Sequence, residues 1–424
     1  MAYDLRRIAP EREVPPFRPA WPLWAFLFLL IVGGGAFGVV RFWPAGESTQ
    51  TVWFWTCVAA FPVLVWTVLL FSYLGVLQSR RTCAEEHNEA RREYKDEVCR
   101  RAGIPLHILD SGFVFSAREH ENTASAVVER QLTLEPKTRF DDDSEAIAAR
   151  WIDPDGYAWR PGDEAADEER HRDVLGYVFG SLLRQIAPAV RALPERTRLI
   201  VRVSVAAQLT TSEIEAIWHD SWDAHQLGNA ALTAVNTDAP DLIAVDGWLD
   251  GAPGFVTDAV NVLCVVQLNP LLNAIPDAGV AEAGAILMFA SRAFVAQRHL
   301  ASNTLLYRPE HHDEEGMAQG LLQVLLWSRS RGSEVNDQWL IGGTEAPLQR
   351  ELSTHMDTQD VGVLKTAGLQ GQHDVDLTIG TIGMAAPWLC VALASAQVRA
   401  SGQKQLLSIA HVDHMTLAVV GPQL

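Results

Sequence analysis

The sequence lacks the short motifs that mark the common catalytic and nucleotide-binding sites. It has no Walker-type phosphate loop, and no GxGxxG pattern follows a predicted strand. The GxSxG pattern of hydrolases, the HExxH pattern of zinc proteases and the HxE…PCxxC pattern of deaminases are also missing. These absences lower the expectation of catalysis in those classes, and they direct attention to organisation and binding.

Cysteine is scarce, and no two cysteines form a CxxC pair. An odd number at irregular spacing indicates neither a disulfide framework nor a zinc or redox site. Free thiols in a reducing compartment are the simplest interpretation. Cys264 lies between Leu263 and Val265 in a predicted strand, so we expect it to be buried and unreactive. The five cysteines are Cys57, Cys83, Cys99, Cys264 and Cys390.

Basic residues are also in deficit: 34 Lys and Arg face 52 Asp and Glu, giving a formal net charge of -18. Phosphate backbones require a basic face, so nucleic acid is not expected as a partner. Solubility is the simplest reason for such acidity. With 424 residues the chain is long enough for two or three folded units at roughly 150 residues each.

Two long runs contain almost no charge. Residues 21–43 have no charged side chain before Arg41, and residues 52–77 have none at all. Each run is long enough to cross a hydrocarbon core about 30 Å thick as a helix. The connector between them is short, which predicts an antiparallel transmembrane hairpin. Gly34 and Gly38 form a small-xxx-small step that would allow close packing of the two helices.

The flanks of the two runs predict an orientation. Arginines precede the first run and follow the second, whereas the region around the connector holds only Arg41 and Glu47. Positive charge stays inside, so both termini are expected in the cytoplasm. The first run is too long for a cleaved signal peptide, and a second span follows it at once. The flanking basic residues are Arg6, Arg7, Arg12, Arg18, Arg80, Arg81, Arg91, Arg92 and Lys95.

The remainder of the chain divides by composition. Residues 1–20 form a cytoplasmic tail, and the charged residues 78–104 predict a helical stalk that Gly103 and Pro105 end. Beyond it, strand and helix patterns alternate, which indicates an α/β fold in two halves, 105–300 and 301–424. Strands are expected at 107–116, 199–205, 241–245, 260–268, 283–289, 339–341, 377–379 and in a hairpin over 405–420. Helices are expected at 174–193, 215–222, 315–327, 348–355 and 384–398.

Three groups of histidines are candidates for chemical sites. His311 and His312 precede Asp313, which favours a helix cap over metal binding. His411 and His414 flank a turn in which Asp413 is expected to bond its own backbone. The pair His219 and His225 is interpreted as structural, and the acidic run 141–143 lacks the spacing of a calcium loop. We therefore expect no metal and no cofactor.

The segment from Leu364 onward resembles the second half of the ketosynthase and thiolase superfamily. The residues that carry the resemblance are the run LTIGTIGMAA from Leu377 to Ala386, the small-residue helix after it, and the final strand pair. The resemblance implies two repeated halves. It also implies a nucleophilic cysteine at a helix start in the first half and a histidine beside the Gly-rich turn. Here no cysteine opens a predicted helix and the turn holds Thr381 and Ile382, so the resemblance implies a lost active site.

The whole layout also resembles membrane-anchored accessory proteins encoded with bacterial type VI secretion clusters. This resemblance implies a non-catalytic adaptor or assembly factor at the bacterial inner membrane, with lipid and a protein partner, an effector or a secretion component. Two alternatives stay open: a membrane-bound acyl- or lipid-modifying enzyme using Cys264 or His411, and a structural subunit of an envelope complex. Tryptophan anchors for a partner are expected among Trp151, Trp159, Trp218, Trp222 and Trp248.

Overall fold

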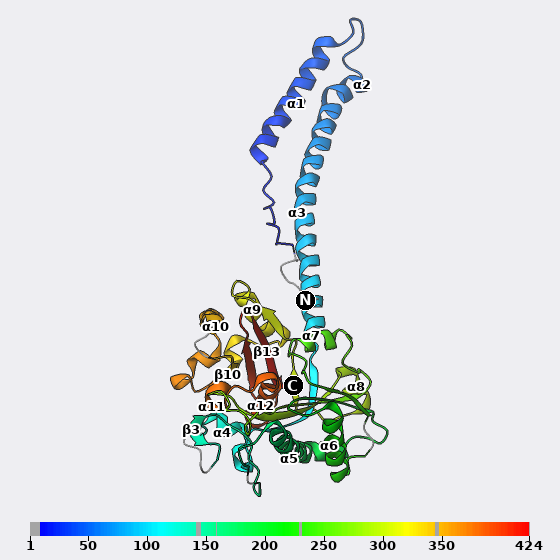
Figure 1. The fold of residues 1–424 in the computed structure, drawn as a ribbon. Coiled ribbons are helices and arrows are strands. Elements are labelled where there is room, and N and C mark those ends of the chain that lie inside the picture. The colour runs from blue at the N-terminus through cyan, green and yellow to red at the C-terminus, as the bar shows by residue number, and fades with distance from the viewer. Residues whose placement is uncertain (1–8, 141–145, 158, 229–230, 344–346, 424) are drawn as a thin grey trace. The chain divides into compact units, whose positions relative to one another are not determined.

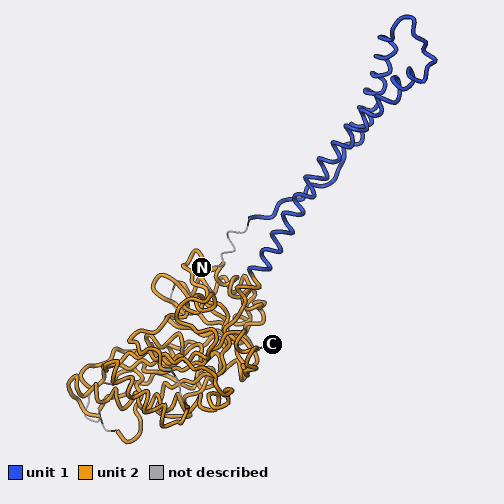
Figure 2. Tube along the Cα trace, turned by 90° about the vertical axis from the view of Figure 1, so that its right-hand side faces the viewer, with its two compact units in different colours: residues 1–98 blue, residues 99–424 orange. Residues whose placement is uncertain are grey.

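The computed structural model describes residues 9–140, 146–157, 159–228, 231–343 and 347–423. The acidic run 141–143 and the arginines at positions 6 and 7 lie outside these ranges. By its internal contacts the chain separates into two compact units, Met1–Val98 and Cys99–Leu424 (Figure 2).

Unit 1 is a helical hairpin. Its first arm is α1 (Trp21–Phe42), and its second is a continuous helical rod made of α2 (Val52–Trp55), the π-helical turn η2 (Thr56–Ala60) and α3 (Phe61–Ala102). Both arms have the length and apolar composition to cross a membrane, and only 6% and 11% of their most apolar stretches are buried. This low burial differs from that of a core helix in a soluble domain. The charged stretch expected as a stalk continues the second arm up to Ala102.

Aromatic side chains and one glycine hold the two arms of the hairpin together. The indole of Trp66 donates to the carbonyl of Trp24 at 3.1 Å. A side chain at Gly35 would lie 2.8 Å from Pro62, whereas Gly34 and Gly38 have nothing within 4 Å. The close approach therefore occurs at Gly35 and not at the Gly34–Gly38 step, because the predicted step lies on the open side of the helix.

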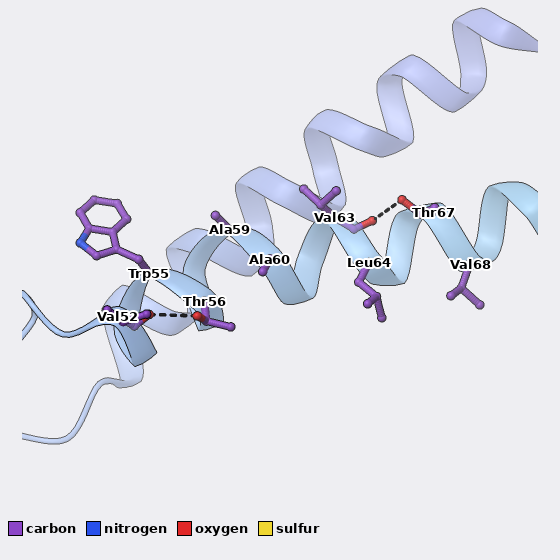
Figure 3. A pocket seen from close by; sticks show the side chains of 9 residues that line it. All are labelled: Val52, Trp55, Thr56, Ala59, Ala60, Val63, Leu64, Thr67 and Val68. Atoms are coloured by element: carbon purple, nitrogen blue, oxygen red, sulfur yellow. Dashed lines mark hydrogen bonds between the residues drawn. The ribbon is translucent and has the colours of Figure 1, made fainter.

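A surface groove of about 840 Å³ runs along the second arm (Figure 3). Its two threonine hydroxyls, those of Thr56 and Thr67, donate to carbonyls of their own helix at 2.9 and 2.8 Å. The groove therefore presents a nearly apolar face, as expected of a helix in lipid.

Unit 2 is built on a mixed sheet in which one strand order occurs twice. The first half runs β5-β4-β6-β7-β1 and the second runs β11-β10-β12-β13-β8, and β1 joins β8. In each half three parallel strands are followed by an antiparallel one. The first five strands are β1 (Leu106–Val114), β4 (Leu199–Ala206), β5 (Ala231–Asn236), β6 (Val260–Gln267) and β7 (Ala283–Ala290). Their counterparts are β8 (Thr304–Leu306), β10 (Val335–Ile341), β11 (Gln372–Asp374), β12 (Lys404–Ala410) and β13 (Met415–Pro422).

Helices cover both faces of each half (Figure 1). The helix α12 (Ala386–Ser401) packs between the two halves, and its apolar cluster includes residues of β1, β6, β7, β12 and β13. The outer face of the first half packs on α5 (Glu164–Arg191) and α6 (Thr211–Ala224), and that of the second on α9 (Met317–Trp327) and α10 (Pro347–Thr358). Since β6 and β7 are buried on both faces, their sequences are mainly apolar, with Asn261 and Gln267 near the two ends of β6.

The shorter elements complete the unit. They are α4 (Ala124–Val128), α7 (Ala244–Leu249), α8 (Arg292–Arg298), α11 (Val375–Thr378), the strand β9 (Glu310–His312) beside β13, and a two-stranded sheet of β2 (Pro136–Thr138) and β3 (Ala146–Ala148).

Two expected strands are wrong. Residues 241–245 enter α7, and residues 377–379 belong largely to α11. In both places a short apolar run fits a strand or a helix equally well. Asp374 caps α11 by accepting the Leu377 amide, whereas α7 starts at Ala244 without a side-chain cap. The helix α5 begins at Glu164, ten residues before the expected start, because Asp163 caps it. Strands β5, β8, β9 and β11 were not predicted.

Candidate functional site

The parallel strands β10, β11 and β12 end at the same edge of the sheet, which is where open α/β sheets usually bind ligands. Gly342 follows β10, Asp376 lies just beyond β11, and His411 follows β12. The Gly342 amide donates to Asp376 at 2.7 Å. Gly342 has φ +94 and leaves no room for a side chain against Ala410. This close contact draws the ends of the three strands together.

Three imidazole rings stack at this edge. His311 comes from β9, and His411 and His414 flank the turn between β12 and β13. The ring centroids of His311 and His414 lie 3.9 Å apart, and those of His411 and His414 lie 4.3 Å apart. The pairing of β9 with β13, which places His311 opposite Thr416, brings the two histidine groups of the sequence into one cluster.

A carboxylate from the first half of unit 2 joins this cluster. Asp241, in the turn that precedes α7, has Oδ2 3.9 Å from Nε2 of His411. On the other side, Nδ1 of His414 contacts Oδ1 of Asp413 at 2.6 Å. We call the set His311, His411, His414, Asp241 and Asp413 the histidine cluster. Sequence reasoning found its members in three separate places and interpreted Asp241 as part of a strand.

Burial and the neighbouring histidines lower the pKa of two of these rings, His311 and His411. Burial is the main cause that lowers the pKa of His311, and the neighbouring histidines lower it further. The pKa of His411 is also lowered, chiefly by burial, with Asp241 opposing. Several buried atoms here have no hydrogen-bond partner among the described residues: Nδ1 of His311, Nε2 of His411, Oε2 of Glu310 and Oδ1 of Asp376. Such atoms in a folded protein call for an explanation, for which an ion or water is a frequent answer.

An acidic cavity of about 650 Å³ lies beside the cluster. Its apolar lining includes Leu348 and Val412, and Val412 is fully exposed at the tip of the β12–β13 turn. The complete lining is Asp313, Glu314, Glu315, Pro347, Leu348, His411, Val412 and Asp413. Asp313 accepts the Gly316 amide at 2.9 Å, so it makes the local bond expected of a residue at a helix start.

The Gly-rich turn singled out in the sequence is closed by backbone contacts. Thr381 donates its amide to the carbonyl of Gly279 at 2.7 Å and accepts the amide of Ala281 at 2.9 Å. Gly380 has φ +116, and a side chain there would lie 2.8 Å from the Gly279 carbonyl. The turn is therefore built against the loop that leads into β7.

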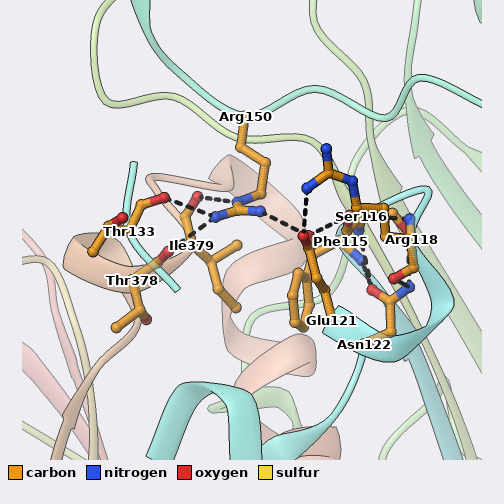
Figure 4. A network of polar contacts seen from close by, with 9 residues as sticks. All are labelled: Phe115, Ser116, Arg118, Glu121, Asn122, Thr133, Arg150, Thr378 and Ile379. Atoms are coloured by element: carbon orange, nitrogen blue, oxygen red, sulfur yellow. Dashed lines mark hydrogen bonds and ion pairs between the residues drawn. The ribbon is translucent and has the colours of Figure 1, made fainter. Parts of the chain in front are cut away.

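An arginine occupies the polar space beside this turn (Figure 4). The guanidinium of Arg150 donates to the carbonyls of Ile379 and Thr378 at 3.3 and 3.4 Å and to that of Thr133 at 3.2 Å. It also pairs with Glu121 at 3.4 Å, with both side chains mostly buried. The carbonyls at the turn are thus engaged in structural bonds. Nothing in the sequence indicated this contact, because it joins segments more than 200 residues apart.

A second buried network fixes the loop between β6 and β7. Arg170 and Glu282 form a two-bonded ion pair at 2.9 and 2.7 Å, with both side chains essentially inaccessible. Nearby, Asp167 accepts the amides of Leu271, Leu272 and Asn273 at 2.8 to 2.9 Å. These bonds determine the path of the loop that carries Gly279 to the Gly-rich turn.

The cysteines are placed away from helix starts. Cys264 is fully buried in the middle of β6, and Cys390 is fully buried inside α12. Burial strongly raises the pKa of both thiols, so neither forms a thiolate at neutral pH. The other three lie within η2 and α3. The expectation of an inert Cys264 agrees with this geometry.

The five tryptophans proposed as partner anchors lie mostly in the interior. Trp151, Trp218, Trp222 and Trp248 are at most 7% exposed, and each belongs to an apolar cluster. Only Trp159 is partly exposed, stacked on Tyr157 at 5.0 Å between ring centroids. The hypothesis of a direct tryptophan contact therefore depends on Trp159.

Comparison with solved structures places this arrangement in a fold class. The ketosynthase from module 1 of the bacillaene synthase from Bacillus amyloliquefaciens FZB42 is similar with a TM-score of 0.50 and 11% identity, covering 76% of this chain and 74% of that one. The ishigamide ketosynthase/chain length factor (TM-score 0.48, 11% identity, 76% and 100% covered) and the fungal type III polyketide synthase ORAS (0.45, 8%, 75% and 100%) are further matches.

The first of these similarities shows a mixed α/β fold of the thiolase-like class, as the sequence resemblance implied. At 11% identity the likeness concerns the fold alone. No protein-family model matches the sequence, and the search of curated proteins found no match.

Proposed function

We propose that this chain is a membrane-anchored, non-catalytic adaptor. In this proposal the helical hairpin of unit 1 lies in a bacterial inner membrane with both termini in the cytoplasm. Unit 2, a degenerate thiolase-like domain, binds a protein partner there. The thiolase-like resemblance implies a catalytic histidine at the Gly-rich turn and a nucleophilic cysteine at a helix start in the first half. The observation that carries the proposal is that neither position holds such a group.

The place expected for a histidine is the Gly-rich turn. It holds Thr381, whose backbone is bonded to the β7 loop, and Arg150 takes the adjoining carbonyls. The place expected for a nucleophile is a helix start in the first half. Both thiols of the folded core, Cys264 and Cys390, are instead buried in element interiors with raised pKa values. General acid–base and nucleophilic steps need exposed groups with matched pKa values, so these features support a binding role.

The anchor is supported by the two long apolar arms and by the arginines at their outer ends. The class of partner, a type VI secretion effector or a component of the secretion complex, follows from the layout-level sequence resemblance. A domain that lacks catalytic groups and is held at a membrane by an anchor is suited to recruiting another protein to that surface.

The proposal is tested by isolating the full chain from its native membranes in mild detergent through a C-terminal tag. We expect a second protein to copurify at a fixed ratio and to be lost on Trp159→Ala but retained in the matched control His219→Gln, an exposed substitution on α6. A lone chain, without a copurifying protein after chemical cross-linking in intact cells, would contradict the adaptor role.

The enzyme alternative has one observation in its favour, the unpartnered His411 beside Asp241 at the carboxyl edge of the sheet. Condensation or hydrolysis of acyl thioesters that disappears in His411→Ala or Cys264→Ala would establish it. Measurement of particle mass in detergent separates the third reading, an envelope subunit, because such a subunit remains in a large assembly.

A further inference from the structure

Arginines from two separate segments of unit 1 lie at one end of the helical hairpin. The rings of Trp24 and Tyr73 lie 5.1 Å apart, so these residues mark one level across the two antiparallel arms. From that level α3 runs seven residues to Arg80, about 10 Å at 1.5 Å per residue. Arg18 precedes Trp24 by six residues, half of them helical, which span roughly 14 Å in the same direction. Arg18 and Arg80 therefore lie at similar depths, just beyond the apolar runs.

The N-terminal tail is held beside α3, which fixes the position of Arg18 (Figure 1). Asn88 is buried, and its side chain accepts the Arg12 amide and donates to the Arg12 carbonyl, both at 2.8 Å. Nε of Arg91 donates to the Ala9 carbonyl at 2.7 Å. Three prolines between this attachment and α1 restrict the backbone further. The tail therefore keeps Arg18 against the helix and does not leave it on a free end.

We propose that Arg18, Arg80 and Arg81 form a binding site for the headgroups of anionic phospholipids, and we call these three residues the arginine collar. The inference rests on the membrane anchor of the proposed function. Guanidinium groups bind phosphate oxygens through two parallel N–H bonds. Basic residues that directly follow a membrane span attract anionic lipids. The collar has both the chemistry and the position that such a headgroup requires.

The side chains of the collar are accessible to a headgroup. Arg18 and Arg80 are exposed, and neither forms an ion pair with another residue that the structure describes. Arg81 pairs with Glu85 at 2.8 Å, with the two side chains 42% and 45% exposed. Exposed pairs of this kind are weak, so a lipid phosphate can replace the carboxylate. Trp21, close to Arg18 in the chain, is 57% exposed, as expected of an aromatic residue at headgroup level.

The opposite end of the hairpin has no comparable group of arginines. It carries a single basic residue, Arg41, and the acidic Glu47. The guanidinium of Arg41 lies over the Phe42 ring, 5.9 Å from its centroid. The collar thus distinguishes the two leaflets. In the orientation of the proposed function it faces the cytoplasmic leaflet.

The test uses the full chain reconstituted into phosphatidylcholine vesicles that contain a small fraction of spin-labelled lipid. Electron spin resonance measures the fraction of label that the protein immobilises, with labelled phosphatidylglycerol or labelled phosphatidylcholine. One arginine near an anionic surface contributes roughly fivefold to a binding constant. We therefore expect the parent to prefer phosphatidylglycerol at least about fivefold at low salt and less at high salt. The triple variant Arg18→Gln/Arg80→Gln/Arg81→Gln should show no preference.

Two further variants separate the collar from a general effect of charge. Arg92→Gln is the matched control, because Arg92 is an exposed arginine on the same helix, roughly 16 Å beyond Arg81. It should keep the preference of the parent. Asn88→Ala frees the tail, so it should lower the preference in the parent and cause no further loss in Arg18→Gln. Circular dichroism verifies that each variant is folded.

The outcomes separate the collar from the anchor. Equal immobilisation of the two lipids by the parent, or an undiminished preference in the triple variant, would overturn the collar and leave the anchor intact. Inorganic phosphate that removed the preference at constant ionic strength would identify a site for free phosphate and overturn the lipid assignment. A chain that does not enter phosphatidylcholine vesicles at all would refute the anchor, and the collar with it.

Discussion

Replacing Arg170 by methionine tests whether the buried ion pair with Glu282 holds the loop between β6 and β7. Both side chains are almost completely inaccessible, at 0% and 1% exposure, and two charge-assisted bonds join them. Methionine fills a similar volume without the charge. The substitution thus leaves the Glu282 carboxylate buried and facing an apolar neighbour.

Removal of one partner of a buried ion pair costs about 3–5 kcal/mol, because the remaining charge is uncompensated. For a unit of about 330 residues, an unfolding entropy of about 2.1 cal/mol/K per residue converts this loss into a drop in Tm of roughly 4–7 °C. The Ile152 and Asn269 amides, which donate to Glu282 at 2.9 and 3.0 Å, keep part of the carboxylate satisfied. The lower end of the range is therefore the firmer expectation.

Thermal unfolding followed by tryptophan fluorescence measures the effect, and Arg172→Met is the matched control. Arg172 lies on the same helix and pairs with Glu213 at the same 2.7 Å, but it is 44% exposed. Exposed pairs contribute only about 0–1 kcal/mol. Equal Tm shifts in the two variants would refute the reasoning, since burial would then make no difference to the pair.

The double variant Arg170→Met/Glu282→Leu sharpens the same test. Replacing a buried pair by apolar residues is often neutral. Here two backbone amides, those of Ile152 and Asn269, would lose their acceptor, at about 1–3 kcal/mol for each unsatisfied group. We therefore expect the double variant to remain well below the parent in Tm. Full recovery would show that Glu282 serves Arg170 alone.

Three further outcomes are expected. Iodoacetamide should modify the exposed Cys83 of the native chain but reach Cys264 and Cys390 only after denaturation, as mass spectrometry would show. Because His311 and His411 have lowered pKa values, the folded state binds fewer protons than the unfolded chain. The protein is therefore most stable above the histidine pKa of the unfolded chain, about 6.5, and loses stability as the pH falls through the lowered pKa values of the folded state. The Tm should therefore fall from about pH 7 to pH 5, with a smaller fall in His311→Gln/His411→Gln. Protease should spare unit 2 in spheroplasts and digest it in inverted vesicles, and the reverse pattern would contradict the predicted orientation.

The parts of the fold that the sequence predicted are those with a strong local signal. Two uncharged runs are sufficient to identify the arms of the hairpin, and continuous apolar runs identify β6 and β7 as strands covered on both faces. The helix expected at 215–222 is found as part of α6, which begins at Thr211 behind a capping box of Thr210 and Glu213. In each case the physical requirement acts within a few residues of the pattern.

The candidate site could not be predicted because its members meet through long-range pairing. His311 reaches His414 only because β9, a three-residue strand without a readable alternation, pairs with β13. Arg150 reaches the carbonyl of Ile379 from a segment 229 positions away. Single-sequence patterns report local periodicity, so they place each residue on an element and leave contacts between elements undetermined.

The repeat of unit 2 shows where its two halves differ. In the first half the six-residue α7 lies between β5 and β6. In the second half the sixteen-residue α12 lies at the equivalent place, between β11 and β12. Trp248 and Trp388 fill the space between them, stacked at 5.7 Å, and the Trp388 indole bonds the Pro240 carbonyl at 2.7 Å. Asp241, an anion, lies in the turn that precedes α7, and a helix this short adds little dipole field to lower the pKa of a thiol.

Under the proposed adaptor role, installing the cysteine and histidine that the thiolase-like resemblance implies should not create thioester chemistry. In the variant Asp241→Cys/Thr381→His the new thiol would lack the helix that activates it, and Arg150 would still hold the carbonyls beside the Gly-rich turn. We expect no condensation of acyl thioesters by the folded variant, measured as release of free coenzyme A thiol. Activity above that of the parent would show that two side chains are sufficient and that the short α7 is no obstacle to catalysis.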